Sequence, residues 1–160
     1  MARAPNQRVS RSKDDESATR SWLSVVRAYN LCDALMARRL GALGVRTAEH
    51  EILANLKREP GLSQQALAAR CFIAKSHISG LLSDLEERGW VRREPDPADA
   101  RAKRLFLAAA GARMAERTAQ VQADVVALMS GATTAASMSQ VQAAMTAVSG
   151  QLQAALDSGD

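Results

Sequence analysis

The sequence has few cysteines, few aromatic residues and no long apolar run, and the first and last of these scarcities exclude whole classes of protein. Its two cysteines, Cys32 and Cys71, stand among apolar residues and not in a disulfide or zinc-ligand spacing, which favours a reducing compartment. No apolar stretch approaches the roughly 20 residues that a membrane-spanning helix needs, and the N-terminus lacks the hydrophobic centre of a signal peptide. We therefore expect a cytoplasmic protein without a membrane segment.

Catalytic motifs are also missing from the sequence. There is no glycine-rich phosphate loop, no G-x-S-x-G motif and no metal-spaced cluster of histidines and cysteines, and the two histidines are His50 and His77. We expect no enzyme activity, no metal and no cofactor.

The composition allows one well-packed core. With 160 residues, 47% of them apolar, the chain can bury a core without disulfides or metals. The net charge of +4 permits an anionic partner, but charges of both signs are spread along the chain. The charge balance alone is therefore weak support for nucleic-acid binding.

The N-terminal third predicts a tail and two helices. Residues 1–17 are polar and of mixed charge, so we expect a flexible tail there. From Ser21 onward, apolar residues recur at helical spacing until Gly44 stops a long amphipathic helix. Thr47 is the expected N-cap of the next helix, which the sequence Glu59-Pro60-Gly61 interrupts.

The C-terminal third is alanine-rich and predicts two further helices. The first covers about 109–129 and the second ends near 156, with a break at 131–137 between them. The final helix carries a narrow apolar stripe that so short a chain cannot cover by itself. The stripe comprises Val141, Met145, Val148, Leu152 and Leu156. We therefore expect a partner helix.

A helix-turn-helix is predicted in the middle of the chain. Ser63 caps a short helix over 64–70, and a second helix over about 74–88 ends at Gly89 in the C-terminal position that glycine favours. Counted from Gln64, the places where two crossing helices need apolar or small residues are all suitably filled. They hold Leu67, Ala68, Cys71, Ile73, Ile78 and Leu81. Phe72 stands where glycine is common, which predicts a somewhat different turn.

The second helix of this pair has the composition of a DNA-reading helix. If Ile78 and Leu81 face the core, helical geometry turns the next residues outward. These are Lys75, Ser76, His77, Ser79 and Gly80. Short polar side chains suit a close approach to base edges and phosphates, although a merely solvated face has the same spacing.

A basic hairpin follows the helix pair. Residues 90–94 can pair with 104–107, which leaves 95–103 as an exposed loop. Arg101, Lys103 and Arg104 lie in or beside this loop, and a loop arginine can enter a minor groove. A charged loop by itself is often only a soluble surface. After a helix-turn-helix it predicts a winged helix, so the expected fold is all-α with a small β-wing.

These segments resemble the MarR family of transcriptional regulators over about 20–157. The resemblance is carried by Leu67-Ala68, Ser76-His77-Ile78-Ser79, Leu85-Glu86-Glu87-Arg88-Gly89-Trp90-Val91 and Asp96-Pro97-Ala98-Asp99-Ala100-Arg101. It implies a homodimer whose segments 18–46 and 109–158 form the dimerisation region, while 47–108 form the winged helix-turn-helix domain. Such a dimer would bind the two half-sites of a palindromic operator in double-stranded DNA.

The same resemblance assigns roles to individual residues. Arg101 would be the minor-groove arginine, with Asp99 as the residue that positions it. The full expected set of DNA contacts is Ser63, Lys75, Ser76, His77, Ser79, Gly80, Asp99, Arg101 and Lys103. Two positions depart from the family pattern, because Gly80 replaces a usual arginine and Asp84 stands where a basic residue is frequent. Asp84 would repel phosphates if it faced the DNA.

Family members commonly bind small aromatic or phenolic acids between the dimerisation helices and the DNA-binding lobe. The resemblance therefore implies a repressor that such an acid releases from DNA. Candidate ligand-binding residues are Trp22, Tyr29, Arg38 and His50, because arginine and histidine can pair with an acid. Trp22 and Tyr29 can equally be core or dimer contacts, and His50 a surface histidine.

Two alternative functions remain open at this stage. Some relatives sense oxidants through a cysteine, which makes Cys32 a candidate, although Cys71 occupies a framework position of the helix-turn-helix. A winged-helix adaptor that binds protein is the second alternative. An adaptor would lack DNA binding that weakens steeply with salt, which the basic wing predicts.

Overall fold

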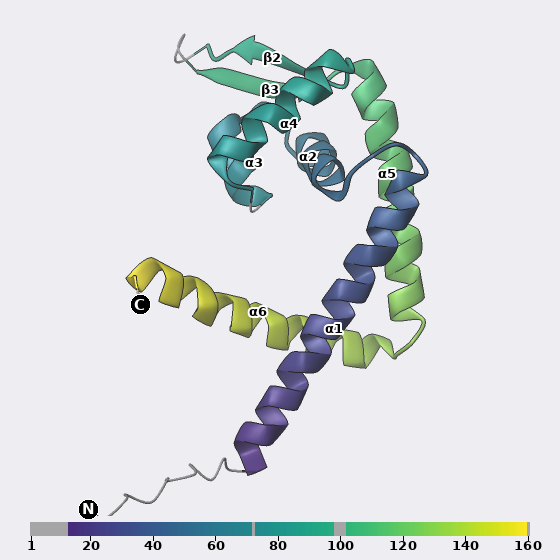
Figure 1. The fold of residues 1–160 in the computed structure, drawn as a ribbon, viewed down its shortest axis with the longest axis vertical. Coiled ribbons are helices and arrows are strands. Elements are labelled where there is room, and N and C mark those ends of the chain that lie inside the picture. The colour runs from purple at the N-terminus through teal and green to yellow at the C-terminus, as the bar shows by residue number, and fades with distance from the viewer. Residues whose placement is uncertain (1–12, 72, 98–101, 160) are drawn as a thin grey trace, which may run out of the picture.

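The fold is helical with a small antiparallel sheet, as the sequence predicts. The computed structural model describes residues 13–71, 73–97 and 102–159 (Figure 1). The elements are α1 (Lys13–Gly41), α2 (Thr47–Arg58), β1 (Leu62–Ser63), α3 (Gln64–Arg70), α4 (Lys75–Glu87), β2 (Val91–Pro95), β3 (Lys103–Leu107), α5 (Ala109–Ser130) and α6 (Ala135–Ser158). Within these residues, no helix combines the length and the apolar character that crossing a membrane requires.

Two helix starts differ from the sequence prediction. Helix α1 begins at Lys13, inside the segment 1–17 that was expected to be a flexible tail, of which residues 1–12 lie outside the described part. The acidic residues Asp15 and Glu16 near this start suit the positive end of the helix dipole. Thr47 is not the N-cap of α2, because Arg46 holds that position and donates its backbone N–H to the Glu49 carboxylate at 2.8 Å.

The winged-helix lobe contains α2, α3, α4 and the sheet. The strand order is β1-β3-β2, and the wing pairs Val91 with Leu107 at one end and Pro95 with Lys103 at the other. Strand β1 was not predicted, since two residues are too short to show an alternating pattern. The fully buried apolar side chains of its main core cluster are Ile52, Leu56, Leu67, Ile78, Leu82, Leu85 and Leu105.

Two glycines allow the tight backbone geometry beside the wing. Gly89 has a φ of +66°, which confirms it as the left-handed residue that ends the second helix of the pair. At Gly111, an added Cβ would lie 1.9 Å from the carbonyl oxygen of Trp90. Only glycine lets the first turn of α5 lie this close to the backbone before β2.

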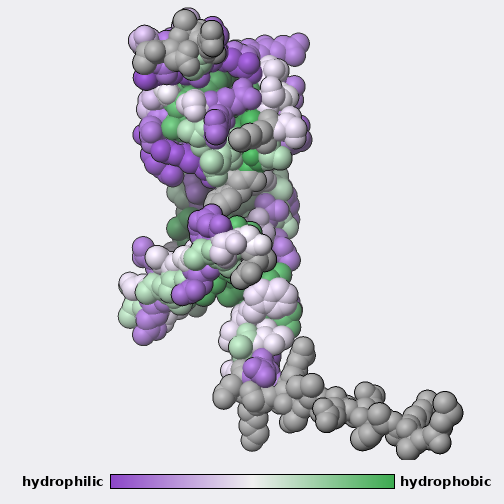
Figure 2. Space-filling model, turned by 90° about the vertical axis from the view of Figure 1, so that its left-hand side faces the viewer, coloured by the Kyte–Doolittle hydropathy of each residue, from purple (hydrophilic) through white to green (hydrophobic). Residues whose placement is uncertain are grey.

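The remaining helices extend away from the winged-helix lobe. Helices α1 and α5 run side by side, and α6 leaves the far end of α5 at a steep angle and passes beneath α3 (Figure 1). None of the described residues of α6 is buried. Apolar patches lie along α6 and below the lobe, whereas the lobe surface in the same view is largely hydrophilic (Figure 2).

Candidate nucleic-acid interface and effector cavity

Helix α4 presents a polar face because its apolar residues point inward. Ile78 and Leu82 are fully buried against α2, α3 and the sheet. The side chains on the other face are exposed and short or polar, and they include Ser76, His77, Ser79 and Gly80. The side chain of Lys75 lies outside the described part. The structure therefore places four of the five predicted α4 positions on one accessible surface.

Side-chain hydrogen bonds hold both ends of α3, the helix that precedes the turn into α4. The hydroxyl of Ser63 accepts the backbone N–H of Ala66 at 3.1 Å, which fixes the start of α3. The side-chain amide of Asn55 in α2 lies 3.5 Å from Cys71 Sγ and donates to it at the end of α3. Phe72, at the expected unusual position of the turn, lies outside the described residues.

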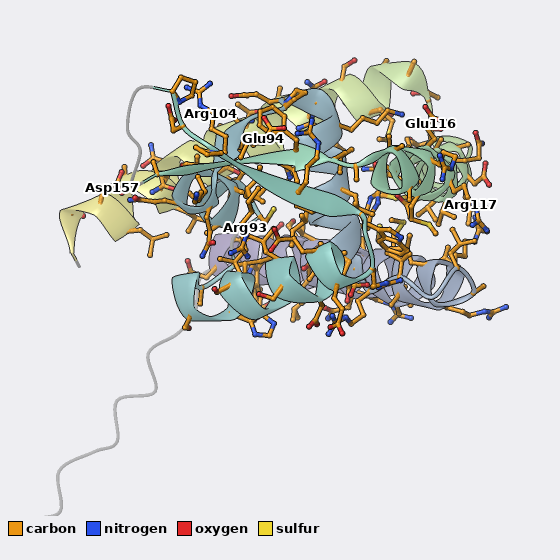
Figure 3. All side chains as sticks on the ribbon, turned by 90° about the horizontal axis from the view of Figure 1, so that it is seen from above. Arg93, Glu94, Arg104, Glu116, Arg117 and Asp157 are labelled. Atoms are coloured by element: carbon orange, nitrogen blue, oxygen red, sulfur yellow. The ribbon has the colours of Figure 1, made fainter. Side chains whose placement is uncertain are left out.

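The wing carries charged side chains on both faces. Arg104 of β3 donates to the Asp96 carboxylate at 2.8 Å, and Glu94 projects from the same face of the hairpin (Figure 3). Arg93 points the other way, toward α4, where it lies 3.0 Å from a carboxylate oxygen of Glu86. Lys103 is exposed at the start of β3. Asp99 and Arg101 lie outside the described residues.

A buried carboxylate fastens α4 to the start of α2. Glu49 is only 2% exposed and receives Arg46 at 2.6 Å and Arg88 at 3.3 Å. Arg46 also reaches Asp84 at 3.0 Å, and the Arg88 guanidinium lies 3.6 Å above the Trp90 ring. Asp84 thus has a partner within the lobe, which accounts for an acidic residue where a basic one is frequent.

Glu49 stays ionised in this cluster. Burial alone opposes the charge of its carboxyl group, but the hydrogen bonds and charge of Arg46 outweigh burial. The charge of Arg88 acts in the same direction, so the pKa of Glu49 is lowered. The charged cluster therefore stabilises the lobe, and it weakens only when acid protonates Glu49.

A cavity of about 580 Å³ lies where the lobe meets the long helices. Its walls come from α1, α2, α5 and the segment around the end of α3. Its lining residues are Tyr29, Cys32, Asp33, Met36, Thr47, Ala48, Glu51, Arg70, Cys71, Ile73, Gln122, Val125 and Val126. This position and size fit a small-molecule site.

Only one of the four predicted ligand-binding residues lines this cavity. Tyr29 does so, and its side chain is 69% exposed. Trp22 and Arg38 are exposed on α1 outside the lining, so neither Trp22 nor Tyr29 is a core residue of this chain. His50 is 1% exposed and is not among the lining residues, so its interpretation as a surface histidine is wrong.

No hydrogen bond of full geometric quality from the described residues reaches either ring nitrogen of His50, and the Gln122 side chain of α5 is the polar group close enough to interact with the ring. Burial lowers the pKa of His50, and the charge of Glu51 and the interaction with the Gln122 side chain only partly oppose this effect. The ring is therefore neutral at physiological pH. A neutral ring that does not line the cavity cannot supply the cation that an acid in the cavity would need.

Both cysteines line the cavity, and Cys71 differs from an activated thiol. Burial raises the pKa of Cys71 to about 11, with a further contribution from the charge of Glu51, while the Asn55 hydrogen bond acts against it. The thiolate is the reactive form, so Cys71 is unreactive at neutral pH. Cys32 is partly buried on α1.

Sequence reasoning missed the polar residues of the cavity. Asp33 follows Tyr29 by four residues on α1, so the helical spacing that selected Tyr29 also places Asp33 on its face. Glu51 and Gln122 had no comparable signal, because α2 and α5 meet only in the folded chain.

Comparisons with known proteins agree with this geometry. A family model described as the MarR family matches residues 43–102, from the end of α1 to the wing loop. The transcriptional regulator HosA of Escherichia coli O111:H- is 33% identical over 66 residues, which cover 41% of this chain and 49% of HosA. The chain spans about half the length of the curated relatives it matches.

Solved structures share the fold over most of both chains. AbsC, a MarR family transcriptional regulator from Streptomyces coelicolor, gives a TM-score of 0.78 at 22% identity, over 90% of this chain and 97% of AbsC. A mutant of MarR from E. coli complexed with operator DNA gives 0.73 at 21% identity, over 86% of this chain and 99% of MarR. The family-model match over residues 43–102 and the shared fold agree with the resemblance seen in the sequence: this part of the chain is similar to the MarR family, and the described residues have the fold of the MarR-family structures.

Proposed function

We propose that this protein is a homodimeric regulator of transcription that binds double-stranded operator DNA through α4 and the wing. The observation that carries the proposal is the accessible face of α4, which presents short polar residues while the apolar side of the helix is buried in the core. A helix of this kind fits the major groove. Solved complexes of E. coli MarR and S. aureus MepR with DNA share the fold.

The proposed DNA contacts come from the turn, α4 and the wing. They are Ser63, Lys75, Ser76, His77, Ser79, Gly80, Asp99, Arg101 and Lys103. Arg101 has a special role in this set, because a wing arginine can enter the minor groove beside the α4 contacts. The remaining side chains would fix the register on phosphates and base edges.

The proposed dimer follows from the apolar surface of α1, α5 and α6. Large apolar side chains on these helices are exposed in the single chain, for example Leu31, Leu128 and Leu152. A second copy would bury them and set the distance between the two α4 helices. Half-sites on one face of B-DNA require a separation of about 34 Å.

We propose that a small aromatic ligand in the cavity controls DNA binding, and that the unliganded dimer represses by blocking polymerase. The cavity joins α1 and α5 to α2, so an occupant would change how the lobe sits on the dimer helices. Among such ligands, family resemblance points to an aromatic or phenolic acid. The alternative of oxidant sensing rests on Cys32, since the raised pKa of Cys71 makes only the Cys71 thiol unreactive.

The test is binding of the purified protein to the DNA beside its own gene, over a salt series and with unrelated DNA as competitor. We expect tight, competitor-resistant binding that weakens steeply with salt. Arg101→Ala should weaken it by about 1–3 kcal/mol, the size of a specific groove contact. Arg117→Ala removes an exposed arginine of α5 away from the wing (Figure 3) and should change nothing.

Two results would contradict the proposal. Weak and indiscriminate binding would favour a protein-binding adaptor, and full affinity of Arg101→Ala at fixed salt would remove the wing from the interface.

A further inference from the structure

We propose that the cavity between α1, α2 and α5 selects an aromatic cation over an aromatic acid. The inference rests on the proposed function only in treating the occupant of the cavity as the effector. It concerns the charge of that occupant, which the side chains lining the cavity determine. It reverses the ligand class expected from the family resemblance.

Two carboxylates line the cavity, one from each side of the joint between the lobe and the long helices. Asp33 belongs to α1 and Glu51 to α2, and both side chains are accessible to solvent. Among the described residues, neither carboxylate makes a hydrogen bond or an ion pair. The two negative charges are therefore available to a ligand.

No positive charge is equally available. Arg70 is the only cationic side chain among the described lining residues, and its guanidinium lies 2.6 Å from the Glu59 carboxylate. Arg38 and His50, which were expected to pair with an acid, do not line the cavity. An acid that loses its hydration inside the cavity needs a cationic partner, and here it would instead meet Asp33 and Glu51.

The other lining groups suit an aromatic cation. The ring of Tyr29 can lie against a cation through its π face, and the Met36 thioether is polarisable. Val125 and Val126 of α5 form an apolar wall that the aromatic rings of the ligand can contact. The charge of Glu51 acts inside the cavity, since it helps to raise the pKa of the Cys71 thiol.

A bound cation would act directly on the contact between the winged-helix lobe and the long helices. One positive charge between Asp33 and Glu51 would draw α1 and α2 toward each other, whereas the empty cavity leaves two like charges facing the same space. The ligand thus favours one separation of the lobe from the dimer helices. This differential affinity for one conformation is what an effector requires.

The experiment compares two ions of nearly equal size and opposite charge, tetraphenylphosphonium and tetraphenylborate. Each is titrated by calorimetry into the full-length protein without DNA. We expect tetraphenylphosphonium to bind more tightly. Asp33→Asn and Glu51→Gln should each weaken its binding by about 3- to 10-fold and should strengthen tetraphenylborate binding.

Glu116→Gln is the matched control, because it removes an exposed carboxylate of α5 that does not line the cavity (Figure 3). Its tetraphenylphosphonium affinity should equal that of the unchanged protein. Thermal unfolding of all variants checks that the fold is intact. Equal or tighter binding of tetraphenylborate, no binding of either ion, or an unchanged affinity in both cavity variants would overturn the proposal.

A parallel DNA-binding assay separates this inference from the proposed function. If the cation binds through Asp33 and Glu51 but does not alter operator affinity, the ligand class stands and control of DNA binding by the cavity fails. If the protein does not bind operator DNA at all, the calorimetric comparison still decides the charge of the ligand.

Discussion

His50 shows how one residue can make the stability of this fold depend on pH. The ring is buried between α2 and α5, and beyond the nearby Gln122 side chain no polar partner of good geometry among the described residues reaches either nitrogen. A buried polar group without a partner costs free energy, and a charged one costs far more. The lowered pKa of His50 expresses the same cost, because the fold resists protonation of the ring.

Replacing His50 with leucine should remove one source of acid sensitivity. Above the ordinary pKa of 6.5 the ring is neutral in both states, so stability is unaffected there. Below it, the unfolded chain binds a proton that the folded chain resists, so stability falls by up to about 1.4 kcal/mol per pH unit. We expect urea unfolding at pH 8, 6 and 5 to show this loss for the unchanged protein and a smaller loss for His50→Leu. Equal losses would refute it.

At the scale of elements, the sequence predicts what depends on local pattern. The spacing of Ile78 and Leu81 correctly predicted which face of α4 is buried, and Gly89 correctly predicted where this helix ends. The N-cap of α2 was misassigned, because Thr47 has the better side chain but Glu49 binds the backbone of Arg46. The cavity could not be predicted in the same way, since its walls come from helices that are far apart in the sequence.

Gly80 allows a test of α4 as the recognition element. It lies inside the helix, and an added Cβ would have no neighbour within 4 Å. Gly80→Ala should therefore stabilise the fold by about 0.5–1 kcal/mol, since glycine weakens helix interiors. If α4 approaches DNA here, the same change should weaken operator binding by about tenfold, the size of a base contact.

Gly41→Ala is the matched control for this pair of measurements. Gly41 ends α1, and an added Cβ there also has no neighbour within 4 Å. Thermal unfolding should show no destabilisation, and operator affinity should not change. Unchanged affinity in Gly80→Ala would mean that DNA does not approach α4 at this position.

At the scale of the whole molecule, contacts within the single chain do not explain why α6 is stable. It has 24 residues, and none of those described is buried. Isolated helices gain little stability in water, so a long helix with an apolar stripe needs a partner surface. Leu156 is 75% exposed, and the apolar patches of α6 continue onto the rest of the molecule below the lobe (Figure 2). A second copy of the chain would cover this surface.

Charging the α6 stripe should therefore separate the dimer. Leu152→Glu places a carboxylate in the proposed interface, and a two-fold symmetric dimer contains the change twice. Losing two buried leucines costs about 3–6 kcal/mol, so the dimer Kd should rise by about 100-fold or more. Ala154→Glu adds the same charge two residues away, on the opposite side of the helix, and should leave the dimer intact. Sedimentation equilibrium at micromolar concentration distinguishes these outcomes. A Leu152→Glu protein that remains dimeric would place the interface elsewhere, whereas a monomer with weakened operator binding would link α6 to the pairing of the two α4 helices.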